Sequence, residues 1–317
     1  MSAKPDVRIL MATYNGSRWL DEQLESLFQQ DFTDWRLVVR DDGSQDTTPK
    51  ILQKWAERHS DKMTWYTDRR RLGPAGSFSD LVFRNSMADY LFFCDQDDVW
   101  APEKLRITLG VLREMEAVQG SEIPLLVHHD LTVCNGSLIP IADSFWDFQA
   151  LDPVKNTLPR LLLQNVVTGC ATGINRSLAQ KAGAIPPEAI MHDWWLALVA
   201  ATFGHIQPIR MPNLIRYRIH GDNACGTTER ALSWSYIRKR LFQRGGPSLH
   251  ARLQPYYRQA AAFQENFHDE LTSEQRTMLE AFVGLPGKSW FERRVLILKY
   301  GFWKQEWIRN LAWLLRA

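Results

Sequence analysis

Residues 91–100 read LFFCDQDDVW, an apolar run that ends in three carboxylates within four positions. A short apolar run of this kind is typical of a strand buried in a parallel sheet. In α/β proteins, ligands bind beyond the carboxyl ends of such strands. We therefore expect the chemistry of this chain at Asp95, Asp97 and Asp98.

These carboxylates suggest a metal site. Close carboxylates repel one another unless a positive charge lies between them, and a hard divalent cation such as Mg2+ or Mn2+ supplies one. Asp95 and Asp97 are two residues apart, so on a regular strand both side chains would leave the same face. The alternative is a turn, with Asp98 capping a helix that begins near Pro102. This stretch alone does not decide between the two.

The composition is that of a globular protein with a sizeable core. The chain has 317 residues, of which 45% are hydrophobic and 23% are charged, which leaves little room for long disordered segments. Its four cysteines are far apart and lack zinc-type spacing, which favours reduced structural thiols and a cytoplasmic protein. Because the sequence shows no signal peptide and no run of about 20 apolar residues, we expect any membrane contact to be peripheral.

Strands and helices alternate along the first hundred residues. The patterns predict strands at 7–12, 35–40, 63–66 and 91–94, and helices at 18–30, 48–59 and 77–86. Such alternation indicates a mostly parallel, doubly wound α/β sheet with flanking helices. No GxGxxG or GxxxxGK[ST] motif occurs, so dinucleotide and P-loop interpretations lack their main support. Phosphate would then be held by a metal and by basic side chains, with Arg71 of the run 69–71 as a candidate.

Polar motifs follow three of the predicted strands. They read Thr13-Tyr14-Asn15, Asp41-Asp42-Gly43-Ser44 and Asp95-Gln96-Asp97-Asp98. In this order, each at the end of a strand, they resemble the family-2 glycosyltransferases of the GT-A fold, closest to bacterial rhamnosyltransferase-like members.

The resemblance implies a donor site at the first two motifs. Thr13, Tyr14, Asn15, Asp41 and Asp42 would line a uracil or thymine. A carboxylate can accept the pyrimidine N3–H, and Tyr14 offers an aromatic face. For Asp42 the alternative is an Asx-type turn.

The third motif would hold the metal and the diphosphate. By the resemblance, Asp95 and Asp97 bind Mn2+ or Mg2+, Gln96 contacts the donor, and Asp98 contacts the donor sugar or caps the helix. A later segment, 217–223, matches the family pattern YRxHxxN. His220 would be a third metal ligand or a diphosphate contact, and Arg218 a phosphate clamp.

The acceptor side would come from the middle of the chain. The family places its catalytic base in a short acidic motif before a helix, which here is Asp193; the alternative is an aspartate that merely complements the helix dipole. Trp100, Gly169, Trp194 and Trp195 would wall the sugar, with one of the two adjacent tryptophans in the core. A single strand is predicted over 125–133, whose His128 and His129 point to opposite faces and do not chelate one ion together.

The last part of the chain is basic. Residues 230–317 contain 15 Lys or Arg and 7 Asp or Glu. An apolar stripe at Tyr300, Trp303, Trp307, Leu311 and Leu314 predicts amphipathic helices. Trp among basic residues suits an anionic membrane surface, and packing on the catalytic domain or on a second copy in a homo-oligomer is the alternative. No nucleic-acid-binding module is recognisable.

We therefore expect a GT-A catalytic domain at 1–229, with its nucleotide-binding half at about 1–100 and its acceptor half at about 101–229, and a Trp-rich helical tail at 230–317. The predicted protein is an inverting, metal-dependent glycosyltransferase on the inner face of the cytoplasmic membrane. It would move a sugar from a dTDP- or UDP-sugar, with dTDP-rhamnose a candidate, to a cell-surface glycan or a lipid-linked acceptor, as in polysaccharide or lipopolysaccharide synthesis.

Two other classes stay open at this point. A haloacid-dehalogenase-type phosphatase also carries DxDx[TV] after an apolar strand, with the first Asp as nucleophile, although that family opens on this motif and about ninety residues precede it here. The third class is a non-catalytic glycan- or nucleotide-binding partner of a synthase complex.

Overall fold

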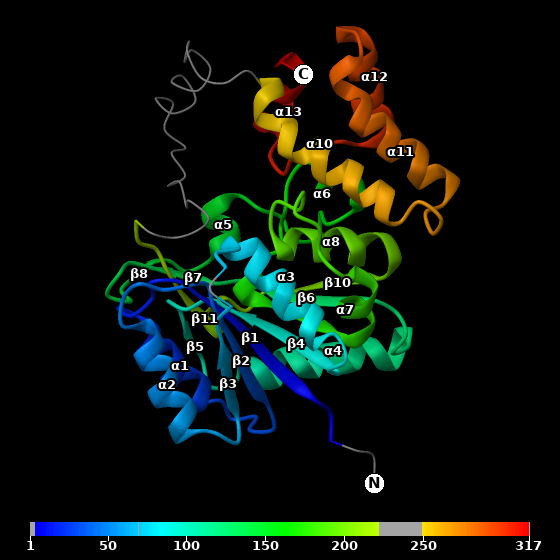
Figure 1. Ribbon diagram of the computed structural model, residues 1–317. Helices are drawn as coiled ribbons and strands as arrows, with labels where there is room; N and C mark the ends of the chain where they lie inside the picture. Colours follow the sequence, from blue (N-terminus) through cyan, green and yellow to red (C-terminus); the bar gives the residue numbers. More distant parts are fainter. Residues whose placement is uncertain (1–3, 69, 222–248, 317) are drawn as a thin grey trace. The chain divides into compact units, whose positions relative to one another are not determined.

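The structure, a computed structural model, describes residues 4–68, 70–221 and 249–316 (Figure 1). It divides into two compact units. The first comprises residues 1–145, 167–187 and 191–224, and the second comprises 146–166, 188–190 and 225–317. The predicted domain boundary at residue 229 lies outside the described residues and stays a prediction.

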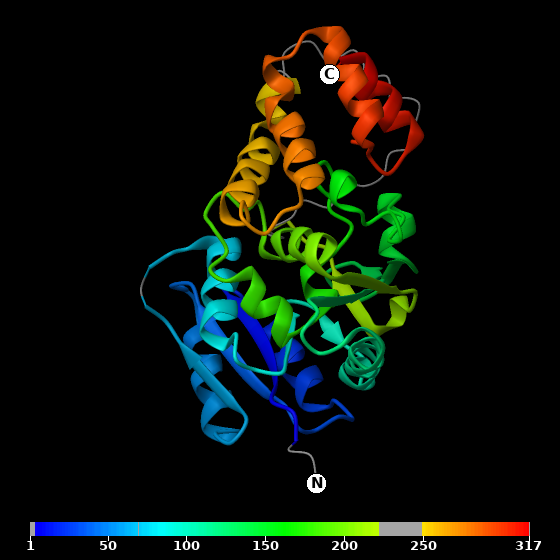
Figure 2. The same ribbon diagram turned by 90° about the vertical axis from the view of Figure 1, so that its right-hand side faces the viewer.

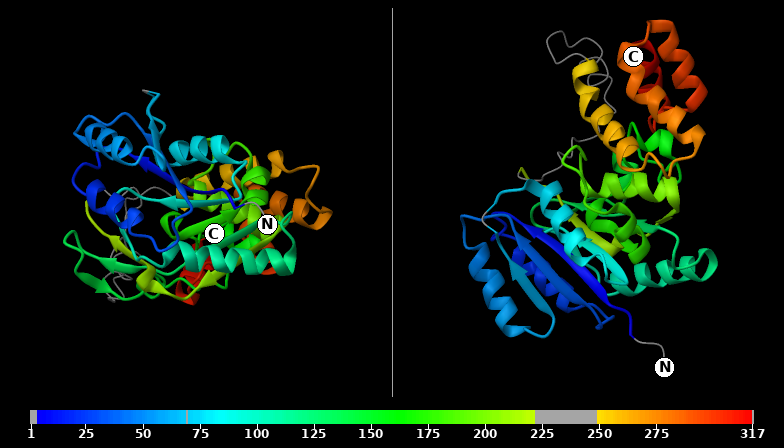
Figure 3. Two further views of the ribbon diagram at one scale, coloured as in Figure 1. Left: turned by 90° about the horizontal axis from the view of Figure 1, so that it is seen from below. Right: turned by 45° about the vertical axis from the view of Figure 1, so that its right-hand side comes forward.

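A seven-stranded sheet forms the centre of the first unit (Figure 3). In spatial order its strands are β10 (His205–Ile209), β6 (Leu125–His129), β9 (Thr172–Asn175), β4 (Tyr90–Cys94), β1 (Val7–Thr13), β2 (Arg36–Asp41) and β3 (Met63–Tyr66). Only β9 runs antiparallel to its neighbours within this sheet. The mostly parallel α/β sheet predicted from the sequence is confirmed.

Helices cover both faces of this sheet. One face carries α1 (Leu20–Phe28), α2 (Thr48–Arg58) and α4 (Lys104–Gln119), and the other carries α3 (Gly73–Asn85), α7 (Arg176–Ala182) and α8 (His192–Phe203). Every residue of β4 is buried, as expected for a parallel strand that is covered on both sides. The apolar run at 91–94 is therefore a central strand, and it delivers the acidic residues to the edge of the sheet.

A second, four-stranded sheet lies beyond the acidic residues in the same unit. It comprises β5 (Val99–Trp100), β11 (Ile215–Arg218), β7 (Thr132–Cys134) and β8 (Pro140–Ala142). β5 and β11 pair antiparallel with Val99 opposite Arg216. Because antiparallel partners run in opposite directions, the residues that follow Arg216 approach those that precede Val99. The small sheet thereby brings Arg218 to the acidic loop.

The single strand predicted over 125–133 is wrong. The chain forms β6, turns at Asp130, and continues as β7 in the small sheet. Asp130 stabilises this turn by accepting the N–H of Leu131 at 2.9 Å. Apolar residues on both sides of the turn hide it from sequence patterns, because both short strands are buried.

The second unit is helical. Its helices are α6 (Leu158–Leu161), α10 (Leu249–Asn266), α11 (Ser273–Gly284), α12 (Trp290–Tyr300) and α13 (Trp307–Arg316). Figure 2 shows α10 and α11 side by side. Both α11 and α12 begin with a capping box, at Thr272 and Ser289, which satisfies backbone donors at each helix start. Among the helices that the structure describes, none is both long and apolar enough to cross a membrane.

The remaining elements are short. They are α5 (Phe145–Gln149), η1 (Gly169–Ala171), η2 (Pro212–Leu214) and η3 (Leu285–Gly287). Cys94, Cys134 and Cys170 are free and buried, and Cys225 lies outside the described residues.

The apolar stripe predicted from Tyr300 to Leu314 does not lie on one helix. α12 ends at Tyr300, α13 begins at Trp307, and Gly301 between them has a left-handed conformation with φ of 72°. Glycine adopts this conformation easily because it lacks a Cβ, and it commonly ends helices. The basic segment 230–244 lies outside the described residues.

The packing of the first unit can be tested at two glycines, one in a crowded position and one in an open position. A Cβ on Gly204, between α8 and β10, would lie 1.8 Å from the backbone oxygen of Pro124, whereas a Cβ on Gly110, inside α4, would meet no atom within 4 Å. We expect Gly204→Ala to lower the free energy of unfolding by roughly 1–3 kcal/mol, because the backbone must shift. Gly110→Ala should raise it by about 0.5–1 kcal/mol. Urea unfolding of both variants measures this, and an unchanged Gly204→Ala midpoint would contradict it.

Candidate active site

The three polar motifs meet at one edge of the main sheet. β4, β1 and β2 are adjacent and parallel, so their carboxyl ends lie together. Thr13 pairs with Asp41 in the ladder between β1 and β2. The motifs that follow these three strands therefore form one region of the first unit.

Hydrogen bonds fasten the first motif to the second. The carboxylate of Asp41 accepts the Thr13 hydroxyl at 3.0 Å, the Ser44 N–H at 3.0 Å and the Ser44 hydroxyl at 2.6 Å. Asn15 donates its N–H to the Ser44 hydroxyl at 2.9 Å and accepts the Gln45 N–H on Oδ1 at 2.8 Å. The Ser44 N–H thus goes to Asp41 and not to Asp42, as the Asx-type turn that was the alternative for Asp42 would require. The bonded atoms of Asp41 and Asn15 hold the two loops together.

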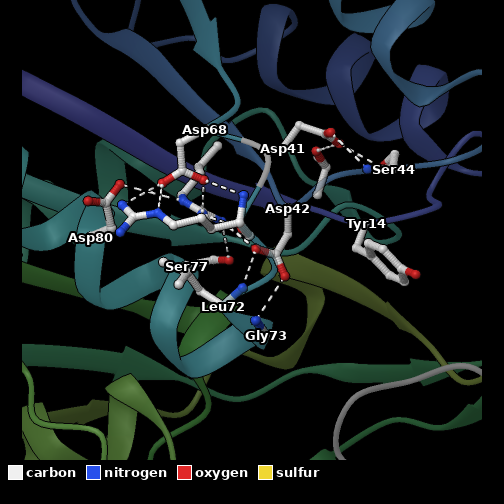
Figure 4. A network of polar contacts seen from close by, with 12 residues as sticks. Tyr14, Asp41, Asp42, Ser44, Asp68, Leu72, Gly73, Ser77 and Asp80 are labelled. Atoms are coloured by element: carbon white, nitrogen blue, oxygen red, sulfur yellow. Dashed lines mark hydrogen bonds and ion pairs between the residues drawn. The ribbon is translucent and has the colours of Figure 1, made fainter.

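Asp42 fastens the loop that precedes α3 (Figure 4). Its carboxylate accepts Arg40 Nη1 at 2.5 Å, the Leu72 N–H at 2.7 Å and the Gly73 N–H at 2.8 Å. Arg40 is fully buried and also pairs with Asp68 at 2.9 Å. These bonds occupy Oδ1 of Asp42 and one acceptor position on Oδ2, so one position on Oδ2 is left for another donor.

Arg71, carried by this loop, lies over Tyr14. The centre of its guanidinium is 4.1 Å from the centroid of the Tyr14 ring, a cation–π distance. In Figure 4 the Tyr14 ring projects away from the network around Asp42. Tyr14 is half-buried and Arg71 is exposed, so both side chains expected at the donor lie together at the surface.

The acidic loop forms two groups. Ligand atoms of Asp95, Asp98 and Cys170 lie within 4.8 Å of one another. Asp97 instead contacts His220, with 2.8 Å between Oδ2 and Nε2. The structure thus brings together Asp97 and His220 of the predicted ligand set, and it adds Asp98 beside Asp95. The alternative in which Asp98 caps a helix is wrong, because β5 intervenes and Glu103 is the N-cap of α4.

The electrostatics of this loop favour a bound cation. Burial, and next the charge of Asp97, raise the pKa of Asp95 to about 7. Burial also raises the pKa of Asp98 well above its usual range. A divalent cation would stabilise the ionised forms of both groups, and their oxygens suit Mn2+ or Mg2+. Burial raises the pKa of the Cys170 thiol, so that this thiol is a poor ligand for a hard ion.

Arg218 is a structural brace rather than the phosphate clamp we expected. Its Nε donates to the carbonyl oxygen of Asp97 at 2.7 Å, Nη1 donates to that of Gly136 at 2.6 Å, and Nη2 pairs with Glu22. Its backbone N–H donates to Asp98 Oδ1 at 3.0 Å. The side chain is 1% exposed. Protein partners therefore hold this guanidinium against the acidic loop, where its charge offsets that of the carboxylates.

Trp100 is a core residue, contrary to the prediction of a sugar wall. Its side chain is 2% exposed and belongs to the main hydrophobic cluster. Above its ring centroid, at 3.0 Å, lies Nζ of Lys104. Trp100 packs inward because its strand, β5, lies against α1.

Sequence reasoning missed Lys104. This lysine is fully buried, donates to the carbonyl oxygen of Cys170 at 3.3 Å, and has its pKa lowered to about 7 by burial. Asp95 and Asp98 partly oppose that decrease. The available signal was its place one turn before Thr108, on the face of α4 that is buried. Lys104 contributes a positive charge beneath the acidic loop.

Asp193 lies in the first turn of α8, with 8% of its surface exposed. Its Oδ1 accepts the Trp194 N–H at 2.6 Å, and the Gly169 N–H also donates to this carboxylate. A Cβ on Gly169 would lie 2.9 Å from His192 Nε2, so a larger residue at position 169 would require His192 to shift. Burial raises the pKa of Asp193 to about 7, and its charge raises the pKa of Asp95 in turn.

The tryptophans that follow Asp193 differ little in exposure. Trp195 is fully buried and Trp194 is 9% exposed. Trp195 is the core member of the pair that the sequence predicted. His128 and His129 are likewise fully buried, with pKa values lowered to about 3 by burial. Both histidines are core residues.

Comparison with known proteins agrees with this arrangement. Residues 8–122 match the model of Glycosyl transferase family 2. An uncharacterized glycosyltransferase of Nostoc sp. is 27% identical over 224 residues, which cover 68% of this chain and 66% of that protein. The dTDP-rhamnosyl transferase RfbG of Shigella flexneri is 32% identical over 107 residues, which cover 32% of this chain and 36% of that protein.

Solved structures show the same fold at low sequence identity. Residues 1–349 of S. aureus TarS, in complex with UDP-GlcNAc, align with a TM-score of 0.58 and 14% identity, over 93% of this chain and 80% of that one. The mannosyltransferase PcManGT of Pyrobaculum calidifontis, in complex with GDP-Man and Mn2+, aligns with a TM-score of 0.52 and 18% identity, over 98% and 88%.

The fold and the acidic strand end define the class as a glycosyltransferase of the GT-A fold. Within that class, the match over residues 8–122 and the relatives from Nostoc and Shigella support glycosyltransferase family 2. It spans between 36% and 66% of the length of the two curated relatives. The phosphatase alternative is wrong, since its motif would stand on the first strand and here follows the fourth strand of the chain.

The raised pKa of Asp193 predicts a pH dependence of stability. Between its ordinary pKa of 3.8 and about 7, the folded protein keeps a proton on Asp193 that the unfolded chain releases. Stability therefore falls as the pH rises through this window, by at most about 1.4 kcal/mol per pH unit for one group. Urea unfolding between pH 5 and pH 8 should show a smaller loss for Asp193→Asn than for the wild type.

The comparison uses the change in the free energy of unfolding with pH. Any constant loss of stability caused by the new amide therefore cancels. Asp61→Asn, at an exposed position, is the matched control and should follow the wild-type slope. Parallel curves for Asp193→Asn and the wild type would contradict the prediction.

Proposed function

We propose that this protein is an inverting glycosyltransferase that moves a sugar from a nucleoside diphosphate to an acceptor hydroxyl. The observation that carries the proposal is the pair of carboxylate sites: the acidic loop after β4 and the separate, buried Asp193. A pKa of about 7 suits a general base near neutral pH. The non-catalytic alternative, a glycan-binding or nucleotide-binding partner, has no use for such a base.

In this mechanism Asp193 takes the proton of the acceptor hydroxyl. The resulting oxygen attacks the anomeric carbon from the face opposite the diphosphate, and the bond between that carbon and the diphosphate oxygen breaks. Inversion follows from this single displacement. Hydrogen bonds from Trp194 and Gly169 hold the Asp193 carboxylate in place.

The donor would bind across the three motifs. Thr13, Tyr14, Asn15, Asp41 and Asp42 are proposed around the base, with the Tyr14 ring as a stacking face and Asp42 Oδ2 as the acceptor for N3–H. Arg71, already over Tyr14, would contact the base or a phosphate. We propose a uracil or thymine nucleotide, since relatives include a dTDP-rhamnosyl transferase and TarS binds UDP-GlcNAc.

A divalent cation, Mn2+ or Mg2+, is proposed at the acidic loop. Asp95, with Asp98 beside it and with Asp97 and His220, supplies suitable oxygen and nitrogen ligands. When bound, such an ion neutralises the negative charge of the departing diphosphate. The GT-A neighbour from Pyrobaculum holds Mn2+ with its sugar nucleotide.

The acceptor is proposed to be a cell-surface glycan or a lipid-linked glycan, met at the inner membrane surface. In the second unit, α12 exposes large apolar side chains, namely Trp290 (59%), Phe291 (70%), Val295 (45%) and Leu298 (61%). Phe291, Val295 and Leu298 follow helical spacing and so share one face. The exposed Lys288 and Lys299 flank this face. Apolar residues with Trp and a basic rim suit an anionic bilayer surface.

Donor binding and turnover can be separated with one variant. Wild type should be stabilised against heat by UDP- or dTDP-sugars more than by GDP-sugars, and only with Mn2+ or Mg2+. Asp193→Asn should keep this stabilisation and lose about 100- to 10,000-fold in turnover, because it cannot accept the proton. Turnover is measured as release of UDP or dTDP with a bacterial lipid-glycan extract as the acceptor source.

Asp61→Asn again serves as control and should retain wild-type turnover. Product formation by Asp193→Asn at the wild-type rate would overturn the assignment of the base. Failure of every sugar nucleotide to stabilise the protein would overturn the proposed function itself.

The face of α12 can be tested with vesicles. Phe291→Ser with Leu298→Ser should weaken binding to phosphatidylglycerol-containing vesicles at least about tenfold, since each large apolar side chain contributes about 1.5–3 kcal/mol when buried. The matched control changes Phe83 and Met87 of the first unit, exposed by 61% and 67%, to Ser and should bind like wild type. Equal binding by both double variants contradicts the proposal. Self-association lost only in the α12 variant would favour a homo-oligomer.

A further inference from the structure

Gln96, which stands between Asp95 and Asp97, is bound to the backbone of the first motif. Its Oε1 accepts the N–H of Tyr14 at 2.9 Å, and its Nε2 donates to the carbonyl oxygen of Tyr14 at 3.1 Å. Both ends of one carboxamide thus pair with both polar groups of one residue, 82 positions away in the chain. These bonds use one N–H and one oxygen lone pair of the carboxamide, so the contact with the donor that the sequence predicted for Gln96 would have to use the remaining ones.

Gly16 makes the approach of Gln96 possible. A Cβ at position 16 would lie 2.1 Å from Oε1 and 2.4 Å from Cδ of Gln96. These distances are far shorter than non-bonded atoms allow, so any larger residue must displace the carboxamide. The glycine after the Thr13-Tyr14-Asn15 motif is therefore explained by Gln96 and not by a turn, as its φ is not among the positive values of this chain.

The paired carboxamide links the two ends of the proposed donor site. On one side Tyr14 holds Arg71 over its ring. On the other side the peptides that flank Gln96 carry Asp95 and Asp97, and Asp97 contacts His220. If the Tyr14 peptide moves, the acidic loop must therefore move with it, because otherwise the two hydrogen bonds to Gln96 break. This bidentate contact bridges the base side and the metal side directly.

We propose that Gln96 is a positioning residue that makes the base side and the metal side of the donor site bind cooperatively. The inference rests on the proposed function, because it assumes a nucleotide and a divalent cation as ligands. A cation that orders the acidic loop would then also order Tyr14, which is proposed to stack on the base. This ordering would not need a phosphate to connect the cation with the base. By linkage, a bound base tightens the cation site by the same factor.

A nucleoside without phosphates isolates this coupling, since it cannot touch the metal. In the wild type, saturating Mn2+ should tighten the binding of uridine or thymidine by at least about fivefold, the lower end of the usual range for coupled sites. In Gln96→Ala the same titration should show affinities that are equal with and without Mn2+. Calorimetry or ligand-observed NMR of the full chain measures both.

Gly16→Ala provides a second, independent variant. It should abolish the coupling as Gln96→Ala does, because the new Cβ displaces the carboxamide. In the double variant the clash is gone, so Gly16→Ala should add no further effect to Gln96→Ala. Additive effects of the two substitutions would show that Gly16 acts elsewhere and would overturn the contact as the cause.

Gln45→Ala is the matched control, as it removes a carboxamide from a neighbouring loop where Nε2 donates only to the Gly43 carbonyl at 3.3 Å. It should retain the wild-type coupling, and thermal unfolding should show that all variants fold. If UDP and dTDP bind with Mn2+ but the nucleoside coupling is equal in wild type and Gln96→Ala, the inference alone is overturned. If neither nucleotide binds the wild type, the proposed function fails with it.

Discussion

The burial of two carboxylates, Asp97 and Asp98, beside the half-buried Asp95 at the end of one strand is the constraint on which this structure depends. Asp97 and Asp98 are 8% and 0% exposed, and such groups are costly to bury as charges unless something compensates them. The compensation comes from three side chains: Arg218 at the end of β11, His220 just after it, and Lys104 from α4. The raised pKa values of Asp95 and Asp98 show that this compensation is incomplete. The remaining negative potential is what a divalent cation would satisfy.

The motifs serve architecture as much as ligand binding. Asp41, Asn15, Gln96 and Arg218 direct their polar atoms to other parts of the protein. Tyr14, Arg71, Asp95 and Asp193 have their functional groups arranged around the region that these bonds hold in place. A site of this kind needs bracing, because loops that end parallel strands have no ladder partners of their own. A residue that the sequence suggests as a ligand contact can therefore instead hold the contacting residues in position.

Local patterns predicted four of the seven strands of the main sheet, and they did not predict β9 and β10. β1 to β4 and the helices between them were found because their burial follows regular periods, and the acidic strand end was found because its apolar run is short and abruptly terminated. The same reasoning failed where burial is continuous or the chain changes direction. It predicted one strand where the chain forms β6 and β7 on either side of Asp130. It also predicted one continuous apolar stripe where Gly301 ends a helix. It also missed Lys104, because a charged residue on a helix is read as exposed.

The sequence by itself determined which residues end each strand, and hence that carboxylates and polar loops gather at one sheet edge. This follows because strand direction and the position of a residue along a strand are local properties. Only the tertiary structure decided which side chains meet there. Arg218 reaches Asp97 across 121 positions, and Gln96 reaches Tyr14 across 82. Such pairs depend on strand order and on the small mixed sheet, and no periodicity in the sequence encodes either. Which polar atoms are already bonded within the protein was decided at this level, and a side chain can bond to a substrate only with atoms that its neighbours in space leave open.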